Sequence, residues 1–244
     1  MRRTVVYAAM TKDEAQRSIR TFYEAVKECQ GGRMTRFVTF EGIEGCGKTT
    51  QIRLASAWLK ERGMPSLATA EPGGTPLGRK IREILLNRGS CAIGAEAELL
   101  LFAAARAQHV RESILPALEE GQWVLCDRFA DATLAYQGFG RGLAAAFIRT
   151  LNDFSAFSLK PDLTLLFDLP VEAGLARAKK RTAGIRPEAA EDRFERENRA
   201  FHGRIRDGYL TLAAGEPERF RIIDGAADIE TVHREVCLRL AELL

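Results

Sequence analysis

The sequence has few of the residues that build metal centres or disulfide frameworks. Its five cysteines are widely spaced and form no CxxC pair, and its three histidines lie far apart. An odd, scattered set of cysteines argues against a disulfide framework and against a zinc site, and it fits a reducing compartment. The cysteines are Cys29, Cys46, Cys91, Cys126 and Cys237.

Long apolar runs and a strong net charge are missing as well. No apolar run approaches the roughly 20 residues that a membrane-spanning helix needs. The apolar patch at 5–10 is too short for a secretory signal, and acidic residues follow it at 13 and 14. The formal net charge of +3 is too small to indicate a nucleic-acid-binding protein. We therefore expect a cytoplasmic protein that works without a membrane or nucleic acid.

The chain has the composition and the alternating pattern of an α/β protein. Its 244 residues are 46% hydrophobic and 28% charged, which is ordinary for a globular chain. Apolar, strand-like runs separated by helices predict a parallel sheet covered on both faces, with the active site beyond the carboxyl ends of the strands. We predict strands at 36–41, 66–70, 122–127, 163–169 and 219–223, and helices at 48–62, 77–88, 95–120, 142–157, 171–181, 190–214 and 228–243.

The first 34 residues resemble an extension placed before the main domain. Capping-box spacing at 11–14, helix-spaced apolar residues and the pair Gly31-Gly32 predict one amphipathic helix at about 12–30. This helix either packs loosely or serves as a partner-binding segment. We therefore divide the chain into an extension at 1–34 and a single domain at 35–244.

A phosphate-binding motif follows the first predicted strand and opens the first predicted helix of the domain. The segment 42–49, GIEGCGKT, matches G-x-x-x-x-G-K-[ST] in the context that this motif requires. Glycines let backbone N–H groups turn towards an anion, and the helix N-terminus adds partial positive charge. We expect Lys48 to reach the β and γ phosphates of ATP and Thr49 to bind Mg²⁺. The expected ATP contacts are Gly42, Ile43, Glu44, Gly45, Cys46, Gly47, Lys48, Thr49 and Thr50.

The motif indicates nucleotide binding but leaves the reaction class open. No Asn-Lys-x-Asp motif for reading guanine occurs, which disfavours a GTPase. Asp127 and Arg128 end the third predicted strand, where the carboxylate can hold Mg²⁺ or the acceptor. The arginine can bind a phosphate through two parallel hydrogen bonds. A plain ion pair at the strand end is the alternative interpretation.

Three further patterns fit a kinase, and each also has a structural interpretation. Phe102 and Arg106 lie one helical turn apart, so the ring can stack on a base while the guanidinium bonds to its edge. Without other context, a core phenylalanine and a surface arginine would explain the same pair. The basic stretch at 177–193 is either a solvated helix face or a lid that closes over ATP and excludes water. The segment 71–76, EPGGTP, predicts a rigid turn after the second strand.

Taken together, the ordered motifs resemble those of the thymidylate kinases. They are FEGIEGCGKTTQ at 40–51, EPGGTPLG at 71–78, LLFAAARAQ at 100–108, Asp127-Arg128 with YQG at 136–138, and PDLTLLFD at 161–168. The resemblance covers about 35–244. It implies a three-layer P-loop nucleoside-monophosphate-kinase-like fold with a five-stranded parallel sheet and helices on both faces. It also implies transfer of the ATP γ-phosphoryl group to thymidine monophosphate with Mg²⁺, and a homodimer.

The resemblance assigns roles to individual residues. Glu44 would contact the sugar 3′-hydroxyl, Asp127 would position Mg²⁺, and Arg128 would hold the acceptor phosphate. In the base pocket, Phe102 would stack on thymine, Arg106 would bond to its carbonyl, Thr133 and Gln137 would contact the base, and Tyr136 would crowd the 2′ position. Gly45 in the P-loop, with arginines in the lid instead, resembles the bacterial lid-arginine subtype, for which Arg181 and Arg186 are the candidates.

Three positions depart from the family pattern. Ala70 stands where the family often has arginine, Ala132 where it often has serine, and Phe129 where it has tyrosine. The first change puts one contact to the acceptor phosphate in doubt. Two alternatives stay open, namely another nucleoside or nucleotide kinase, and a nucleotide-binding module that has lost activity.

Overall fold

A computed structural model describes residues 35–86, 92–182, 193–195 and 197–244. Five strands form one parallel sheet, as expected from the sequence, and the structure shows their order to be β2-β3-β1-β4-β5. The helix predicted at 12–30 lies outside the described residues. The strands are β1 (Phe37–Glu41), β2 (Ser66–Ala70), β3 (Trp123–Asp127), β4 (Leu163–Asp168) and β5 (Phe220–Asp224).

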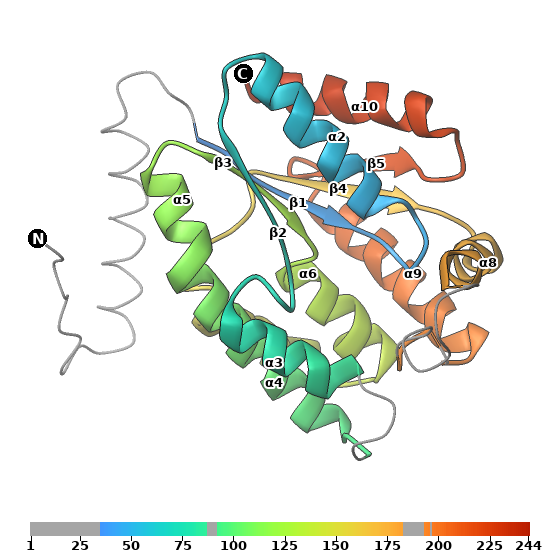
Figure 1. Ribbon diagram of the computed structural model, residues 1–244. Helices are drawn as coiled ribbons and strands as arrows, with labels where there is room; N and C mark the ends of the chain where they lie inside the picture. Colours follow the sequence, from blue (N-terminus) through green and yellow to red (C-terminus); the bar gives the residue numbers. More distant parts are fainter. Residues whose placement is uncertain (1–34, 87–91, 183–192, 196) are drawn as a thin grey trace, which may run out of the picture.

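Helices cover both faces of this sheet. Side chains alternate between the faces along each strand, so Val38 and Phe40 of β1 pack with α2 (Lys48–Glu61) and α10 (Ile229–Ala241). Phe37 of the same strand packs with the opposite layer. Figure 1 shows α2 and α10 together on one face of the sheet and α9 (Arg199–Gly215) on the other. The arrangement is the three-layer α/β fold expected from the sequence.

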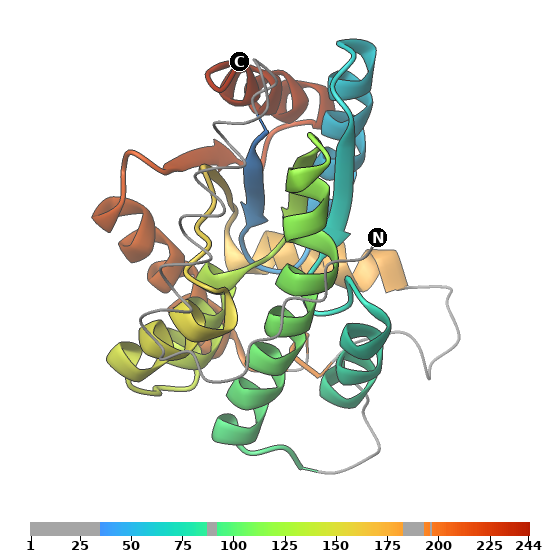
Figure 2. The same ribbon diagram turned by 90° about the vertical axis from the view of Figure 1, so that its left-hand side faces the viewer.

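A long helical segment connects β2 and β3 after helix α3 (Pro76–Leu86). It consists of α4 (Ala95–His109), a π-helical turn η1 (Val110–Ile114) and α5 (Leu115–Glu119), and Figure 2 shows it as one continuous rod. The sequence predicted one helix at 95–120. Pro116 has no N–H to bond to the carbonyl one turn earlier, and the helix is widened just before it.

The segment after β3 is helical, although no helix was predicted there. It comprises α6 (Ala130–Thr133) and the π-helical η2 (Leu134–Gly140), whereas α7 (Ala145–Ser155), which follows, corresponds to the helix predicted at 142–157. Glycines at 138 and 140 weaken any local helix signal. A Cβ atom on Gly140 would lie 2.8 Å from Cε2 of Phe201, so this glycine permits close packing against α9. Tertiary packing rather than propensity therefore produces this helix.

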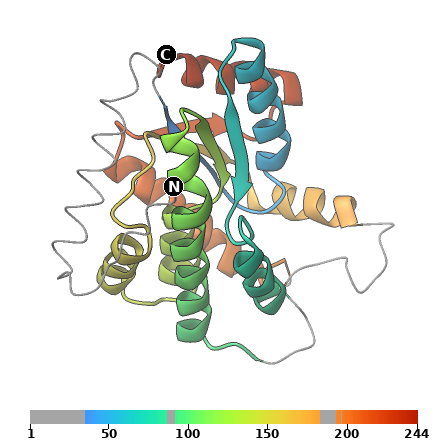
Figure 3. The ribbon, with the colours of Figure 1, turned by 60° about the vertical axis from the view of Figure 1, so that its left-hand side comes forward.

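Helix α8 (Val171–Thr182) follows β4 and projects outward from the sheet (Figure 3). The last long helix before β5 begins at Arg199, not at 190 as predicted. Its start is set by Asn198, whose side chain accepts a hydrogen bond from the Phe201 N–H at 2.8 Å. Within the described residues, no helix has the length and apolar character needed to cross a membrane.

Candidate active site

The loop between β1 and α2 has the backbone shape of a phosphate cradle. Gly42, Gly45 and Gly47 have φ angles of 136°, 72° and 97°, which residues with side chains rarely adopt. A Cβ atom on Gly42 would also lie 2.5 Å from the carbonyl oxygen of Phe167. The motif recognised in the sequence therefore forms a glycine-dependent turn directly before helix α2.

Lys48 holds its ammonium group against this loop. Its Nζ donates to the carbonyl oxygens of Gly42 at 3.1 Å and Ile43 at 2.9 Å, and to Cys46 Sγ at 3.3 Å. The side chain is largely buried and lines the main cavity of the site. The loop thus fixes a single cation at the cavity wall, where it can meet a phosphate group.

Thr49 and Asp127 bring two oxygen donors together at the same wall. The Thr49 hydroxyl donates to Asp127 Oδ2 at 2.9 Å, and both residues line the cavity. Hydroxyl and carboxylate oxygens suit Mg²⁺, which also keeps water and phosphate ligands. The described residues contain no group of three or more His, Cys, Asp or Glu side chains that could hold a metal alone. A metal here would be held by these two side chains together with oxygens from water or a bound ligand.

Arg128 occupies the centre of the site in an uncommon backbone conformation. Its φ of 70° is left-handed, which is rare for a residue with a side chain. The guanidinium group donates to the Gly42 carbonyl at 2.8 Å, the Tyr209 hydroxyl at 3.2 Å and Glu44 Oε1 at 3.2 Å. It also lies 4.8 Å from the centre of the Tyr136 ring. These contacts fix the cation between the P-loop and the helical layer.

Glu44 is held as a carboxylate by its surroundings. Burial by itself would raise its pKa, but a contact with His202, the charge of Arg128 and a hydrogen bond from Tyr136 lower the pKa to about 2. The His202 Nδ1 atom lies 3.3 Å from Glu44 Oε2. At neutral pH this side chain is a hydrogen-bond acceptor, as a contact to a sugar hydroxyl requires.

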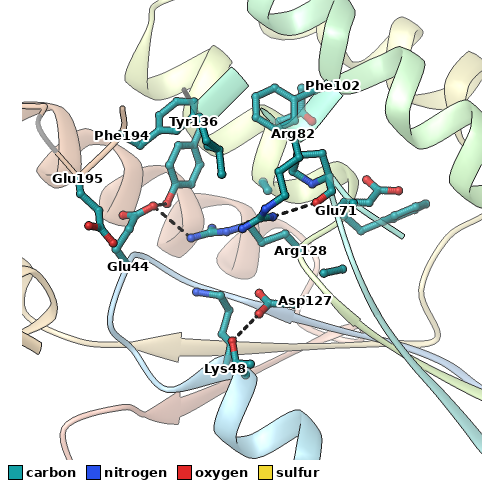
Figure 4. Close-up of a pocket in the computed structure, with 18 of the residues that line it drawn as sticks. Glu44, Lys48, Glu71, Arg82, Phe102, Asp127, Arg128, Tyr136, Phe194 and Glu195 are labelled. Carbon is teal, nitrogen blue, oxygen red and sulfur yellow. Dashed lines mark hydrogen bonds and ion pairs between the residues drawn. The ribbon is translucent and has the colours of Figure 1, made fainter. Parts of the chain in front are cut away.

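One cavity of about 820 Å³ collects most of the residues that the sequence singled out. Figure 4 shows Arg128 between Lys48 and Asp127 on one side and the rings of Phe102 and Tyr136 on the other. The expected site residues that line it are Glu44, Gly45, Gly47, Lys48, Thr49, Thr50, Phe102, Arg106, Asp127, Arg128, Thr133, Tyr136 and Gln137.

Other expected residues do not face this cavity. The side chains of Ile43 and Cys46 are buried within the loop, so contacts from these positions to ATP would come from backbone atoms. Gly42 carries no side chain and directly follows β1. Arg186 lies outside the described residues, and Arg181 belongs to helix α8 with no described side chain.

Three aromatic rings form another part of the cavity wall, and Tyr136 joins them to the P-loop through its hydrogen bond to Glu44. The centroids of Phe102 and Phe194 are 6.2 Å apart, and Tyr136 meets Phe194 edge to face at 5.6 Å. Phe194 is almost fully buried, whereas Phe102 is partly exposed to the cavity. Such a cluster can receive a flat, apolar ring.

Arg106 forms the polar side of this part of the cavity. Its guanidinium donates to Glu71 Oε2 at 2.9 Å, Asn152 Oδ1 at 2.7 Å and the Phe129 carbonyl at 3.2 Å. A further bond reaches the Thr133 hydroxyl at 2.6 Å. An arginine has five N–H donors, so one is left for a bound molecule. Arg106 is thus a buried, rigid donor and not the surface arginine of the alternative interpretation.

Several cavity residues were not predicted as site residues. Arg79, Arg82 and Leu86 lie on one face of α3, at spacings of three and four, and all line the cavity. Arg82 is anchored by a bond to the Pro72 carbonyl at 2.9 Å. This helical spacing was visible in the sequence, but which face would meet the site was not. The other unpredicted residues with polar or aromatic side chains are Glu71, Phe129, Arg177, Phe194 and Glu195.

The chain has a parallel sheet, a glycine-rich phosphate loop, and one cavity that contains both this loop and the aromatic cluster with Arg106. These features define a P-loop kinase of the nucleoside monophosphate kinase class. The family model described as thymidylate kinase matches residues 40–236. A thymidylate kinase of Syntrophus aciditrophicus is 62% identical over 207 residues, covering 85% of this chain and 94% of that relative. One of Geobacter sulfurreducens is 56% identical over 197 residues, covering 81% and 92%.

A solved structure agrees with the sequence relatives. The crystal structure of thymidylate kinase from Ehrlichia chaffeensis superposes with a TM-score of 0.66 at 33% identity, covering 84% of this chain and 98% of that chain. The chain belongs to the thymidylate kinase family. The resemblance drawn from the sequence motifs is therefore confirmed, and the chain is an ATP-dependent nucleoside monophosphate kinase.

Proposed function

We propose that this enzyme transfers the γ-phosphoryl group of ATP to thymidine monophosphate, giving ADP and thymidine diphosphate. The observation that carries the proposal is one cavity in which Lys48 of the P-loop, Arg128 and the aromatic base pocket face the same space. Phosphoryl transfer asks mainly for positioning and charge stabilisation, and it needs no covalent enzyme intermediate.

On the donor side, the P-loop binds the phosphates of ATP. The backbone of 42–50 surrounds the β and γ phosphates, and Lys48 offsets their charge. Thr49 and Asp127 are the residues that would hold Mg²⁺, because their oxygens lie side by side at 2.9 Å. When bound, the ion would neutralise charge on the phosphate oxygens and fix their geometry.

On the acceptor side, the base end selects a pyrimidine and the centre holds its phosphate. Phe102 stacks on the thymine ring, and the free N–H of Arg106 bonds to a thymine carbonyl. Thr133 and Gln137 line the same end, and Tyr136 crowds the 2′ position. Glu44 accepts a hydrogen bond from the sugar hydroxyl. Arg128, held between the two ends, binds the acceptor phosphate.

Residues 177–193 form the lid of this proposed kinase domain at 35–244. Arg177, on α8, lines the cavity and is anchored by a bond to the Gly225 carbonyl at 2.6 Å. Arg181 and Arg186 would add positive charge over the transferring phosphoryl group. A closed lid excludes water, which would otherwise accept the phosphoryl group from ATP.

The test is the release of ADP from Mg-ATP by the purified protein, with a panel of nucleoside monophosphates and with thymidine. The proposal predicts the highest kcat/KM with thymidine monophosphate. A higher value with thymidine or another monophosphate would assign a different acceptor to the same fold. Binding of ATP and thymidine monophosphate without turnover would identify a nucleotide-binding module that has lost activity.

We further propose a homodimer formed through helices α4 and α7, which contact each other. Large apolar side chains on these helices face solvent, with Leu100 56%, Phe147 58% and Phe154 63% exposed. Exposed apolar surface of this kind favours association. Light scattering should give twice the 27.0 kDa chain mass. Phe154→Glu should give the monomer, whereas Leu238→Glu, on α10, should leave the dimer intact.

We also propose that the enzyme works in the cytoplasm. Cys46 and Cys126 are buried free thiols, which fits a reducing compartment. Fractionation of the source cells would place the activity with cytoplasmic markers, and recovery with extracellular or periplasmic proteins would contradict this location.

A further inference from the structure

Glu98 lies one turn before Phe102 on helix α4 and is fully buried, yet the proposed chemistry gives it no role. Its Oε1 accepts a hydrogen bond from the Gln137 side-chain amide at 2.7 Å and one from Arg141 Nε at 3.3 Å. Its Oε2 accepts from Arg141 Nη2 at 3.2 Å and from Arg193 Nη2. One carboxylate thus joins the base pocket to the segment at 193.

These contacts determine which end of the Gln137 amide is available to a bound base. A carboxylate offers acceptors only, so Gln137 must present its NH₂ group to Glu98. Its amide oxygen is then left for other partners, and among the described residues no hydrogen bond occupies it. Gln137 lines the cavity while being only 1% exposed, so a bound molecule is the partner within reach.

An acceptor in this position distinguishes between pyrimidines. Thymine carries a hydrogen on N3, whereas cytosine has an unprotonated N3 that is itself an acceptor. A fixed amide oxygen accepts a hydrogen bond from N3–H of thymine. With cytosine the same oxygen would face N3, which is also an acceptor, so binding would be weaker. If the Gln137 amide group could rotate so that its oxygen and NH₂ group exchanged places, the NH₂ group would face the base and the discrimination between the two bases would weaken.

We propose that Glu98 is a positioning residue for base selection, because it holds the Gln137 amide with its oxygen towards N3–H of the thymine base. Arg141 and Arg193 in turn hold the Glu98 carboxylate, so its orientation depends on two guanidinium groups from other parts of the chain. The inference rests on the proposed function, since it concerns the acceptor base of that reaction.

The test compares two ligands on each variant. One is thymidine monophosphate, and the other is its 3-deaza analogue, in which C–H replaces N3–H. Wild type should bind thymidine monophosphate at least about tenfold more tightly than the analogue, the worth of one well-placed hydrogen bond. In Glu98→Gln the amide at 98 can donate to the Gln137 oxygen and turn it away from the base, so the ratio should fall to about twofold or less.

Two further variants separate positioning from general damage to the fold. Glu197 also pairs with Arg141, at 2.6 Å, but no bond joins it to Gln137. Glu197→Gln therefore removes a similar charge from the same arginine and should keep the wild-type ratio. In the exchange variant Glu98→Gln/Gln137→Glu, the amide at 98 donates to the carboxylate at 137. The carboxylate then presents an acceptor to the base, so the wild-type affinity ratio of the two ligands should be restored.

The affinity of each variant for both ligands is measured by titration calorimetry, and a melting temperature for each variant reports its stability. Partial unfolding lowers the active fraction for both ligands alike, so it does not change their affinity ratio. A wild-type ratio near one, or an unchanged ratio in Glu98→Gln, would overturn the inference. Turnover of thymidine monophosphate by wild type is measured separately, so failure of the proposed function is visible independently of failure of the positioning role.

Discussion

A buried glutamate at the end of β1 predicts a specific dependence of stability on pH. Glu41 is fully buried, and its carboxyl accepts hydrogen bonds from the Phe129 N–H and the Tyr209 hydroxyl, each at 2.7 Å. Burial and the nearby charge of Asp131 raise its pKa to about 8, although Arg128 and the two hydrogen bonds act in the opposite direction.

The sign of the effect follows from proton binding. Between pH 4.5, where the unfolded chain loses this proton, and pH 8, the folded state keeps it. The unfolded state then binds fewer protons, so stability falls as pH rises through this window and becomes level above it. At about 1.4 kcal/mol per pH unit, the loss between pH 6 and pH 8 is about 2 kcal/mol.

The assay is urea unfolding of wild type and Glu41→Gln at pH 6, 7 and 8. Glutamine stays neutral and keeps an acceptor for the Phe129 N–H, so it imitates the protonated carboxyl. The unfolding free energy of wild type should fall by about 2 kcal/mol relative to this variant from pH 6 to pH 8. Glu218→Gln, at an exposed position, should show no such divergence. A constant difference between wild type and Glu41→Gln at all three pH values would refute the reasoning.

Three other predictions concern the active site. Lys48→Ala should lower kcat by about 10²–10³-fold, as expected for loss of one cation at the transferring group, and near-normal turnover in a stopped assay would contradict this role. Phe102→Ala should raise KM for thymidine monophosphate about tenfold or more and leave KM for ATP unchanged, since a stacked base is worth about 1–3 kcal/mol; equal changes in both constants would argue for a general defect. Arg79 has no ion pair among the described residues and shares the cavity with Ala70, so Arg79→Ala should weaken binding of thymidine monophosphate but not of thymidine. Addition of Ala70→Arg should then restore the affinity, and a variant that weakens both ligands equally would rule out a phosphate contact.

The sequence predicted the parts of the site that short segments specify by themselves. The P-loop is defined by glycines whose positive φ angles few other residues adopt, and Asp127-Arg128 follows an apolar strand that could be recognised directly. The strand order could not be read from single segments. It places Ala70 beside Asp127 in the register of β2 and β3, and so brings the EPGG turn to the cavity that Asp127 lines.

The remaining site residues depend on contacts between distant segments. Phe194 reaches the aromatic end of the cavity from the turn at 193–195, and its packing on Phe102 and Tyr136 joins three elements. Helix η2 carries Tyr136 and Gln137. Its glycines lower the local helix propensity, so the sequence pattern does not reveal this helix. Packing on α9 stabilises it instead. Arg128 has a φ of 70° and a side chain in contact with four groups from distant segments, and no local pattern reveals such an arrangement.

The most direct test of the central claim follows the phosphoryl group itself. Purified protein is incubated with Mg²⁺, thymidine monophosphate and ATP labelled at the γ phosphate, and the products are separated by chromatography. The account predicts that the label appears in thymidine diphosphate, in step with ADP formation and with little free phosphate, because the closed site excludes water. Label that accumulates as inorganic phosphate, or that stays in ATP, would contradict phosphoryl transfer to thymidine monophosphate.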